Sequence, residues 1–312
     1  MTKQNQDPST RVSRAGKNAR EPSLTQDDSD KGVKKNQGAR LLAIDIDGTL
    51  LDSSYQIPPE NLAALRRAHQ AGVEIVLVTG RRHAFALPTA SELGFDLWII
   101  SSNGAVTRSL TGETFHRDLL PLETARALCA QMDEFRGNLV ITFDREGKGA
   151  LLLEHLEELT LSIRRWLEKN MECIEFSRPI EQALGSDPLQ AMFCGSVERM
   201  RQAAAVLASA PVRAHITQLK TEYPARDLCI LDVLNRSCSK GHALERWAHH
   251  RGIAPEAVVA IGDNHNDAEM LNFAGRAFIM ENAAPELKEN GWTVTRSNDA
   301  CGVAAVVDLL IE

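Results

Sequence analysis

The sequence of 312 residues lacks the features of several protein classes. Its six cysteines are scattered and no two have CxxC spacing, so we expect reduced thiols rather than disulfides or a zinc site. No apolar run approaches the roughly 20 residues that cross a bilayer, which predicts no membrane partner. A formal charge of −7 and a pI near 5.8 disfavour nucleic acid as a ligand. These absences together favour a cytoplasmic globular protein.

Residues 1–38 contain few apolar side chains. Eight Lys/Arg and five Asp/Glu are mixed there with Ser, Gln, Asn and Gly, and no apolar stretch of the kind found in secretory signals follows the basic residues. Such a composition cannot bury enough surface to offset the entropy lost on ordering, so residues 1–38 are predicted to form a disordered polar tail. Because the tail carries three net positive charges, the remainder carries about −10.

Beyond the tail, strand-like and helix-like segments alternate. Apolar runs at 41–44, 73–78, 97–100 and 257–261 alternate with helical periodicity at 62–68, 83–93 and 243–250. This order predicts an α/β fold with a doubly wound, mainly parallel Rossmann-like sheet, built from residues 39–115 and 236–312. Residues 116–235 mix helices with strand-like runs, which predicts an inserted α+β domain with strands at 139–143, 150–153, 191–194, 212–216 and 228–233.

Two acidic residues follow the first of these strands. The run Leu41–Ile44 ends in Asp45-Ile46-Asp47-Gly48-Thr49-Leu50, and Gly48 permits a sharp turn where the acids emerge. Open α/β sheets bind ligands outside the carboxyl ends of their strands. Like charges held together there raise each other's pKa unless a cation lies among them. The motif therefore predicts a metal site.

A second acidic motif ends the strand at 257–261. Gly262-Asp263-Asn264-His265-Asn266-Asp267 repeats the pattern of an apolar strand followed by glycine and acid. Asp263 and Asp267 could complete the oxygen ligands that Mg²⁺ prefers. An Asp-Asn loop could equally be an ordinary turn.

Three further segments carry weaker signals. Thr79-Gly80-Arg81 follows the strand at 73–78 and offers a hydroxyl, an approachable backbone and a cation to an anion, although such a tripeptide is usually a helix cap with a surface arginine. Lys240 in Ser239-Lys240-Gly241 would, taken alone, be ordinary surface. Asn103 could face the same crevice, but Asn103-Gly104 is first of all a hairpin signal.

Four of the segments described above together resemble the motifs of a known family. Asp45-Ile46-Asp47-Gly48-Thr49-Leu50, Thr79-Gly80-Arg81, Ser239-Lys240-Gly241 and Gly262–Asp267 match, in order, the four motifs of the haloacid dehalogenase-like (HAD) hydrolases. The form of the last motif and the place of the insert resemble the Cof-type branch, subfamily IIB, with a C2 cap. The resemblance extends from about residue 40 to residue 312.

The resemblance implies a role for each matching residue. Asp45 would be the nucleophile that forms an aspartyl-phosphate, and Asp47 the general acid and base. Mg²⁺ would be bound by Asp45, Asp263 and the backbone carbonyl of Asp47, with Asp267 in support. Charge on the phosphoryl group would be stabilised by Lys240. Phosphate and substrate contacts are expected from Thr79, Gly80, Arg81, Asn103 and Asn266.

The family implies a Mg²⁺-dependent phosphatase acting on a small phosphorylated metabolite such as a sugar phosphate. Two alternatives stay open: a phosphotransferase or sugar phosphomutase that uses the same aspartyl chemistry, and a receiver-like module that only binds. The insert would act as a lid, and Asp144, Arg145 and Lys148 lie in a loop that could select the leaving group, although a solvated hairpin tip is the simpler interpretation. The physiological substrate and the oligomeric state are not predicted.

Overall fold

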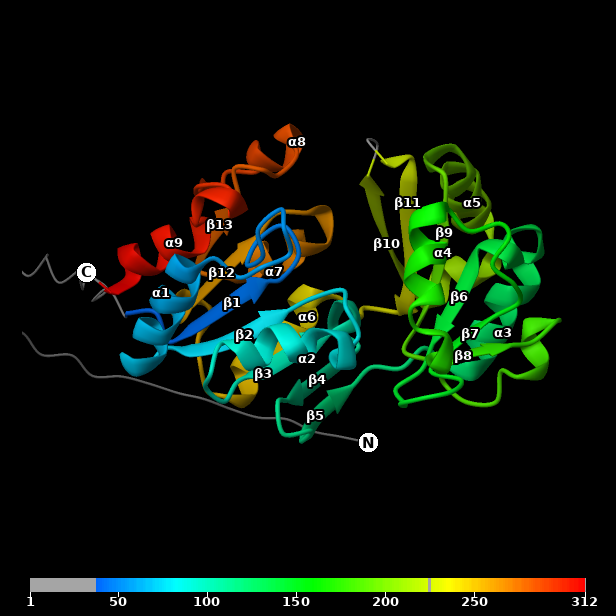
Figure 1. Cartoon of the computed structure of the whole chain (residues 1–312), viewed down its shortest axis with the longest axis horizontal. Coiled ribbons are helices and arrows are strands. Elements are labelled where there is room, and N and C mark those ends of the chain that lie inside the picture. The colour runs from blue at the N-terminus through cyan, green and yellow to red at the C-terminus, as the bar shows by residue number, and fades with distance from the viewer. Residues whose placement is uncertain (1–37, 224–225, 312) are drawn as a thin grey trace, which may run out of the picture. The chain divides into compact units, whose positions relative to one another are not determined.

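The computed structural model describes residues 38–223 and 226–311 (Figure 1). The predicted tail, residues 1–38, lies outside the described residues except for its last position. The described chain contains two β-sheets, one of eight strands and one of six. Among its helices, none combines the length and the apolarity needed to cross a membrane.

The eight-stranded sheet is mainly parallel, as predicted. Its pairs are parallel from β14 to β3, and the last two pairs, β3–β4 and β4–β5, are antiparallel. The spatial order is β14 (Thr293–Val294), β13 (Arg276–Ile279), β12 (Val258–Gly262), β1 (Leu41–Asp45), β2 (Glu74–Val78), β3 (Trp98–Ser101), β4 (Val106–Ser109) and β5 (Thr114–Arg117).

Helices cover both faces of this sheet because its central strands are apolar on both sides. On β1, Leu42 and Ile44 belong to a core shared with α1, α2 and α9, whereas Leu41 and Ala43 belong to a core shared with α6, α7 and α8. Side chains alternate between the faces of a strand, so a continuous apolar run supplies both cores. The helices are α1 (Pro59–Gln70), α2 (His83–Glu92), α6 (Lys240–His250), α7 (Ala268–Phe273), α8 (Pro285–Lys288) and α9 (Gly302–Ile311).

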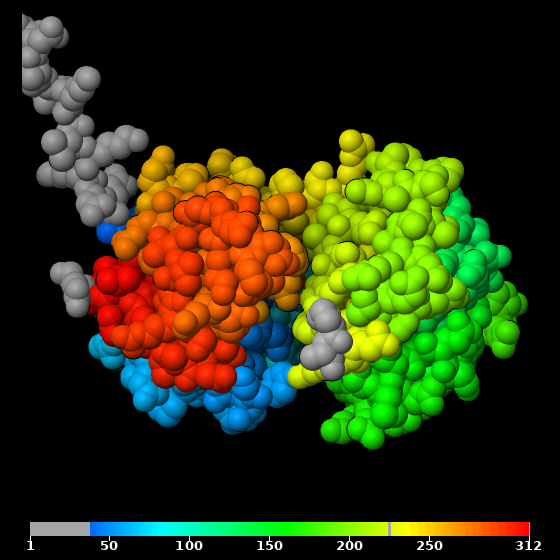
Figure 2. Space-filling view, turned by 90° about the horizontal axis from the view of Figure 1, so that it is seen from above, coloured from blue at the N-terminus to red at the C-terminus, as the bar shows by residue number. Residues whose placement is uncertain are grey.

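Segments from the two ends of the described chain lie side by side in this sheet. β1 pairs with β12, and α1 contacts α9, so residues near 60 meet residues near 305 (Figures 1 and 2). The insert therefore divides the sequence of this sheet without dividing the sheet.

The six-stranded sheet belongs to the insert and is mainly antiparallel. Its order is β10 (Ile216–Tyr223), β11 (Leu228–Asn235), β9 (Gln190–Gly195), β6 (Leu139–Thr142), β7 (Leu151–Leu153) and β8 (Ile174–Phe176). Its helices are α3 (Leu122–Gln131), α4 (Leu161–Glu168) and α5 (Val197–Ser209). This mixed order confirms the predicted α+β insertion.

One predicted strand of the insert is wrong. Residues 212–216 were expected to form a strand because Val212 and Ile216 are apolar and β-branched, but Pro211–His215 is a 3-10 helix and β10 begins only at Ile216. Pro211 lies in the first turn of that helix, where its missing N–H costs nothing. The true strand was missed because β10 is an edge strand with polar, partly exposed side chains.

Candidate active site

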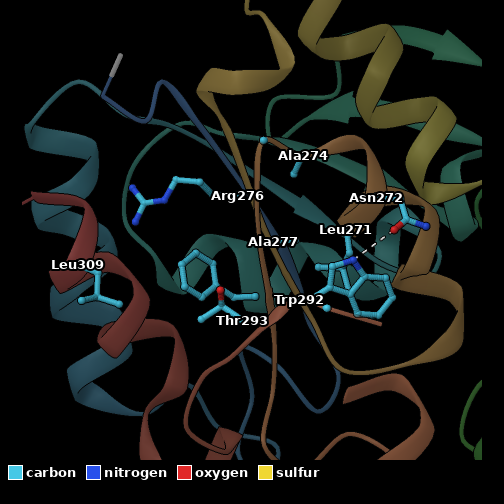
Figure 3. Close-up of a pocket in the computed structure, with 11 residues that line it drawn as sticks. Leu271, Asn272, Ala274, Arg276, Ala277, Trp292, Thr293 and Leu309 are labelled. Carbon is cyan, nitrogen blue, oxygen red and sulfur yellow. Dashed lines mark hydrogen bonds between the residues drawn. The ribbon is translucent and has the colours of Figure 1, made fainter. Parts of the chain in front are cut away.

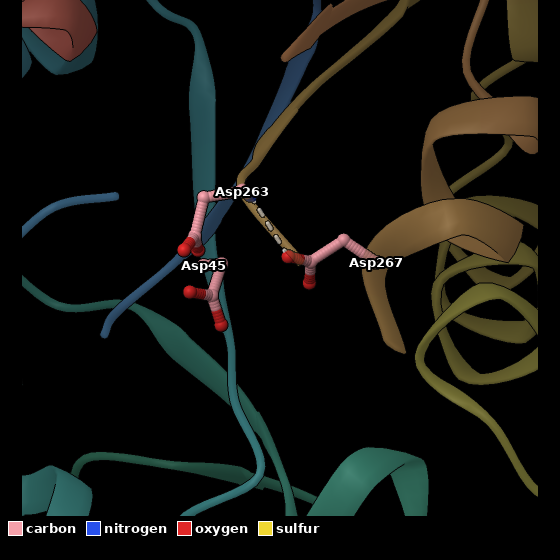
Figure 4. Close-up of side chains that lie close together, drawn as sticks. All are labelled: Asp45, Asp263 and Asp267. Carbon is pink, nitrogen blue, oxygen red and sulfur yellow. Dashed lines mark hydrogen bonds between the residues drawn. The ribbon is translucent and has the colours of Figure 1, made fainter. Parts of the chain in front are cut away.

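Three carboxylates converge at the carboxyl end of the parallel strands (Figure 4). Asp45 ends β1, Asp263 directly follows β12, and Asp267 lies just before α7. Because β1 and β12 are parallel neighbours, their ends meet at the same edge of the sheet. One oxygen from each of the three side chains lies within 4.8 Å of the others. We call these three residues the acid cluster.

Lys240 is the cation in contact with the acid cluster. Its Nζ donates to Asp45 Oδ1 and to Asp267 Oδ1, at 2.6 Å each, and the residue is 1% exposed. Burial disfavours the charged ammonium, but the carboxylates of Asp267 and Asp45 outweigh it and raise the pKa of Lys240. The lysine that would be ordinary surface if read alone is therefore a buried, charged member of the site.

Asp267 organises the loop that carries Asp263. Its Oδ2 accepts the backbone N–H groups of Asp263 and Asn264, at 3.0 Å each, while Oδ1 accepts from Lys240. Asn264 completes a capping box at the start of the short helical turn that follows. Both oxygens of Asp267 are thus engaged by the protein, so Asp45 and Asp263 are better placed to bind a ligand.

The charges of the acid cluster do not balance. Three carboxylates face one ammonium, which leaves two formal negative charges in a place where Asp45 is 4% and Asp267 0% exposed. Burial, followed by the neighbouring carboxylates, raises the pKa of Asp45 well above its usual range and that of Asp263 to about 7. A divalent cation with a preference for oxygen ligands would neutralise the excess, so the donor set fits Mg²⁺.

Gly48 lets the first motif approach the acid cluster. Its φ is +80°, and a Cβ at this position would collide with the Asp263 carboxylate. Thr49, from the same turn, donates its hydroxyl to Asp263 Oδ1 at 3.0 Å. Only glycine satisfies both the conformation and the close approach.

Asp47 lies outside the acid cluster and pairs with Arg81. The guanidinium donates from Nε at 2.7 Å and from Nη2 at 2.5 Å to the two carboxylate oxygens, and the Asp47 side chain is 45% exposed. Arg81, which the resemblance assigns to phosphate binding, is therefore paired with Asp47, which it assigns as the general acid and base. The pair joins the turns after β1 and β2.

The turns after β2 and β3 are joined by backbone hydrogen bonds. Asn103 donates its N–H to the Thr79 carbonyl at 3.0 Å, and Ser102 donates to the Arg81 carbonyl at 2.8 Å. A Cβ at Gly80 would lie 3.2 Å from Asn103 Oδ1, so this backbone and this amide are in close contact. Asn103 also accepts from Asn266 Nδ2 at 3.0 Å. Thr79, Gly80, Asn103 and Asn266 therefore lie together, as expected from their places at strand ends.

Two polar residues that contact the site were not predicted to do so from the sequence. Thr49 could have been predicted, since it belongs to the first motif. Asp232, on β11 of the insert, accepts from Asn103 Nδ2 at 3.3 Å and could not have been predicted, because a single acid in a strand normally indicates a solvent-facing position.

Of the three residues in the candidate specificity loop, Asp144 is arranged differently from either expectation. Asp144 accepts from Arg108 at 3.0 and 2.6 Å and from Arg117 at 2.5 Å, so it is bound by two arginines from the β4–β5 hairpin. Arg145 donates to the Gly149 carbonyl within its own loop, and Lys148 is exposed. In this structure Asp144 joins the insert to the eight-stranded sheet.

A separate hollow of about 540 Å³ opens beside β13 and β14 (Figure 3). Leu271, Trp292 and Leu309 are among its lining residues, and Trp292 Nε1 donates to Asn272 Oδ1 at 3.2 Å. Its lining includes no Asp, Glu, His or Lys and no residue of the acid cluster. Arg276 is the charged residue of its lining, so the hollow offers no carboxylate that could attack phosphorus or hold a metal.

Comparison with known proteins now identifies the class. Residues 42–307 match the family model described as haloacid dehalogenase-like hydrolase. The chain belongs to this family. The resemblance in the four motifs is confirmed, and so is the fold of a Rossmann-like sheet with an inserted cap.

Individual relatives are phosphatases. The chain is 30% identical over 295 residues to the phosphatase YwpJ of Bacillus subtilis (strain 168), covering 87% of this chain and 100% of the relative. It is 31% identical over 253 residues to the HMP-PP phosphatase of Shigella boydii serotype 4 (strain Sb227), covering 80% and 91%. Among solved structures, a HAD subclass IIB sugar phosphatase superposes with a TM-score of 0.69 at 22% identity, covering 87% and 98%. The protein is thus similar to Cof-type phosphatases over most of its length.

Proposed function

We propose that the protein is a Mg²⁺-dependent phosphatase that hydrolyses small phosphomonoesters through an aspartyl-phosphate on Asp45. The observation that best supports this proposal is the acid cluster with its buried lysine. The three carboxylates face one ammonium, so two negative charges are left uncompensated. The motifs of a hydrolase family and the phosphatase relatives support the same reaction.

Asp45 and Asp263 would hold the cation, with the Asp47 carbonyl as the family implies. The ion would supply Lewis-acid stabilisation of the phosphoryl oxygens. Asp267 would hold the Asp263 loop through its two backbone bonds, and Thr49 would orient the Asp263 carboxylate.

Asp45 would attack phosphorus with a carboxylate oxygen. The new O–P bond forms as the bond from phosphorus to the leaving oxygen breaks, and Asp47 gives that oxygen a proton. In the second step Asp47 takes a proton from water, whose oxygen attacks phosphorus and releases Asp45 and inorganic phosphate. Lys240 already touches Asp45 Oδ1, so it would offset negative charge on this group throughout.

Asp47 must leave its pair with Arg81 before it can transfer a proton. A phosphate dianion entering the site is a competing bidentate partner for the guanidinium. Substrate binding would thus move Arg81 from Asp47 to the phosphoryl group, and the released Asp47 carboxylate would take up from solvent the proton that it then gives to the leaving oxygen. Thr79, the Gly80 N–H, Asn103 and Asn266 would bind the remaining oxygens.

We further propose that the insert, predicted at residues 116–235, acts as the cap over a core formed by 39–115 and 236–312. The first two residues of the predicted insert pair in β5 of the eight-stranded sheet and therefore belong to the core. The cap would exclude water and contact the leaving group. A small phosphorylated metabolite is the proposed substrate, in line with relatives such as the HMP-PP phosphatase.

The test is phosphate release from a panel of phosphorylated metabolites with and without Mg²⁺. We expect turnover that is lost on chelation and abolished in D45N, because an amide is a poor nucleophile. D96N, at an exposed position, is the matched control and should keep full activity. Full activity of D45N, or of the metal-free protein, would contradict the mechanism. An isomeric sugar phosphate in place of inorganic phosphate would favour the mutase.

A further inference from the structure

Asp232 is a buried acid that the insert contributes beside the proposed site. Its strand neighbours Leu231 and Val233 pack into the apolar core of the insert. Because side chains alternate along a strand, Asp232 lies on the opposite face of β11. The residue is only 8% exposed.

The partners of Asp232 are neutral and distant. Asn103 Nδ2 donates to its Oδ2 at 3.3 Å and Gln190 Nε2 to its Oδ1 at 3.4 Å, both long for hydrogen bonds. Burial raises the pKa of Asp232 to about 7, although the bond from Asn103 and the charge of Lys240 oppose the rise. A carboxylate so poorly compensated is worth less to stability than an apolar side chain of similar size. Stability therefore gives no reason for an acid here.

The acid does determine how the Asn103 amide points. Above its pKa of about 7, the Asp232 carboxylate is ionised and only accepts hydrogen bonds, so the amino group of Asn103 faces Asp232 and its carbonyl faces Asn266, which donates to it at 3.0 Å. If the Asn103 amide were flipped, its carbonyl oxygen would face the Asp232 carboxylate and its amino group would face the amino group of Asn266.

The Asn103 amide lies between the two turns that would bind phosphate. On one side it contacts the Gly80 backbone, and on the other it holds Asn266 in the loop of Asp263. Asn103 itself is 2% exposed and its backbone N–H is held by the Thr79 carbonyl, so the orientation of its side-chain amide is the remaining variable.

We propose that Asp232 is a positioning residue: it orients the Asn103 amide, and through it Asn266, so that the insert helps to build the phosphate-binding site. This inference rests on the proposed function. Asp232 itself touches no reacting atom; it acts through Asn103.

The first experiment separates positioning from stability with D232L, which replaces the acid by an apolar side chain of similar size. We expect unchanged or higher thermal stability together with a roughly 10- to 100-fold loss of kcat/KM, the range for lost supporting hydrogen bonds. D232N retains an oxygen that can accept from Asn103 and should recover most of the activity. E168Q, at an exposed position of the insert, is the control and should change neither quantity.

The second experiment is a double-mutant cycle with N103A. If Asp232 acts through Asn103, D232L should cost little further activity once N103A is present. Fully additive losses would overturn the proposal, and so would a D232L protein with wild-type kcat/KM. Should D232L fail to fold, D232A, which also removes the acceptor for Asn103, and D232A/N103A provide the same cycle.

Binding of inorganic phosphate in the presence of Mg²⁺, measured by calorimetry, separates this inference from the proposed function. We expect D232L to bind phosphate more weakly than the wild type. Phosphate binding that depends on Asp232 without any turnover would refute the phosphatase alone. Turnover and phosphate binding that are both insensitive to D232L would refute the inference alone. A wild type that neither binds phosphate nor turns over would refute both.

Discussion

Lys240 lies between two buried carboxylates and compensates part of their charge. We predict that K240M lowers the free energy of unfolding by about 3–5 kcal/mol, because it leaves Asp45 and Asp267 buried without their cation. The deficit should shrink as the pH falls, since protonation removes the unpaired charges. Urea unfolding at pH 8 and pH 5 measures both effects.

The matched control is K169M at an exposed position, which should change stability by less than about 0.5 kcal/mol. A K240M protein as stable as the wild type at pH 8 in the absence of divalent metal would show that the carboxylates do not need the lysine.

Gly104 and Gly112 form a matched pair that separates backbone strain from close contact. Both have positive φ, +106° and +91°, but a Cβ at Gly104 would collide with the Ser239 carbonyl, whereas one at Gly112 has nothing within 4 Å. We predict a cost of roughly 1–2 kcal/mol for G112A, and for G104A a further ~1–3 kcal/mol from overpacking. Equal losses in chemical denaturation would mean that the turn after β3 does not need to approach the start of α6 closely.

At the scale of elements, Asp144 connects the β6–β7 loop of the insert to the β4–β5 hairpin. Arg108 and Arg117 bind it from the hairpin and hold its pKa below the usual range despite partial burial, which opposes this. An acid with a lowered pKa stabilises the fold above its unfolded pKa, and this stability is lost as the pH falls through the folded value.

We therefore predict that D144N costs about 1–2 kcal/mol at pH 7, discounted for the partial exposure of the site. The difference from the wild type should narrow below about pH 4, near the unfolded pKa of aspartate. Urea unfolding across this pH range is the measurement, with E146Q at an exposed position of the same loop as control. A difference independent of pH would show that the two arginines do not stabilise the ionised form.

At the scale of the whole molecule, Mg²⁺ should stabilise the fold because the acid cluster is preformed and under-compensated. At a concentration 100 times its dissociation constant, a ligand that binds only the folded state contributes about 2.7 kcal/mol. For a chain of this size, that raises the melting temperature by roughly 4–5 °C.

Differential scanning calorimetry with and without chelator measures this shift. D263N, which removes one carboxylate, should abolish most of it, whereas D96N should retain it. An unchanged melting temperature of the wild type on saturation with Mg²⁺ would exclude the ion from the acid cluster.

Most of the fold could be predicted because its signals are local. The apolar runs of β1, β2 and β12 each span a few neighbouring residues, and their alternation with helices implies a parallel sheet. β10 was missed because this local signal is weak in an edge strand with polar side chains. Its pairing with β11 defines it as a strand.

The candidate site, like the fold, could be predicted only in part from the sequence. Asp45 and Asp263 could be expected to meet, because both follow parallel strands of one sheet. Three contacts could not be predicted from the sequence: Asp47 with Arg81, Asp144 with two arginines, and Asn103 with Asp232. Each depends on the exact direction of side chains on separate elements.

By itself, the sequence determined the family, the mainly parallel sheet, the insertion and the residue types that carry the chemistry. The reason is that these follow from short motifs and from the period of apolar residues. The tertiary structure alone decided which charges compensate one another. That outcome depends on contacts between residues as far apart as Asp45 and Lys240, whose strength is set by distance and burial, and neither quantity exists until the chain has folded.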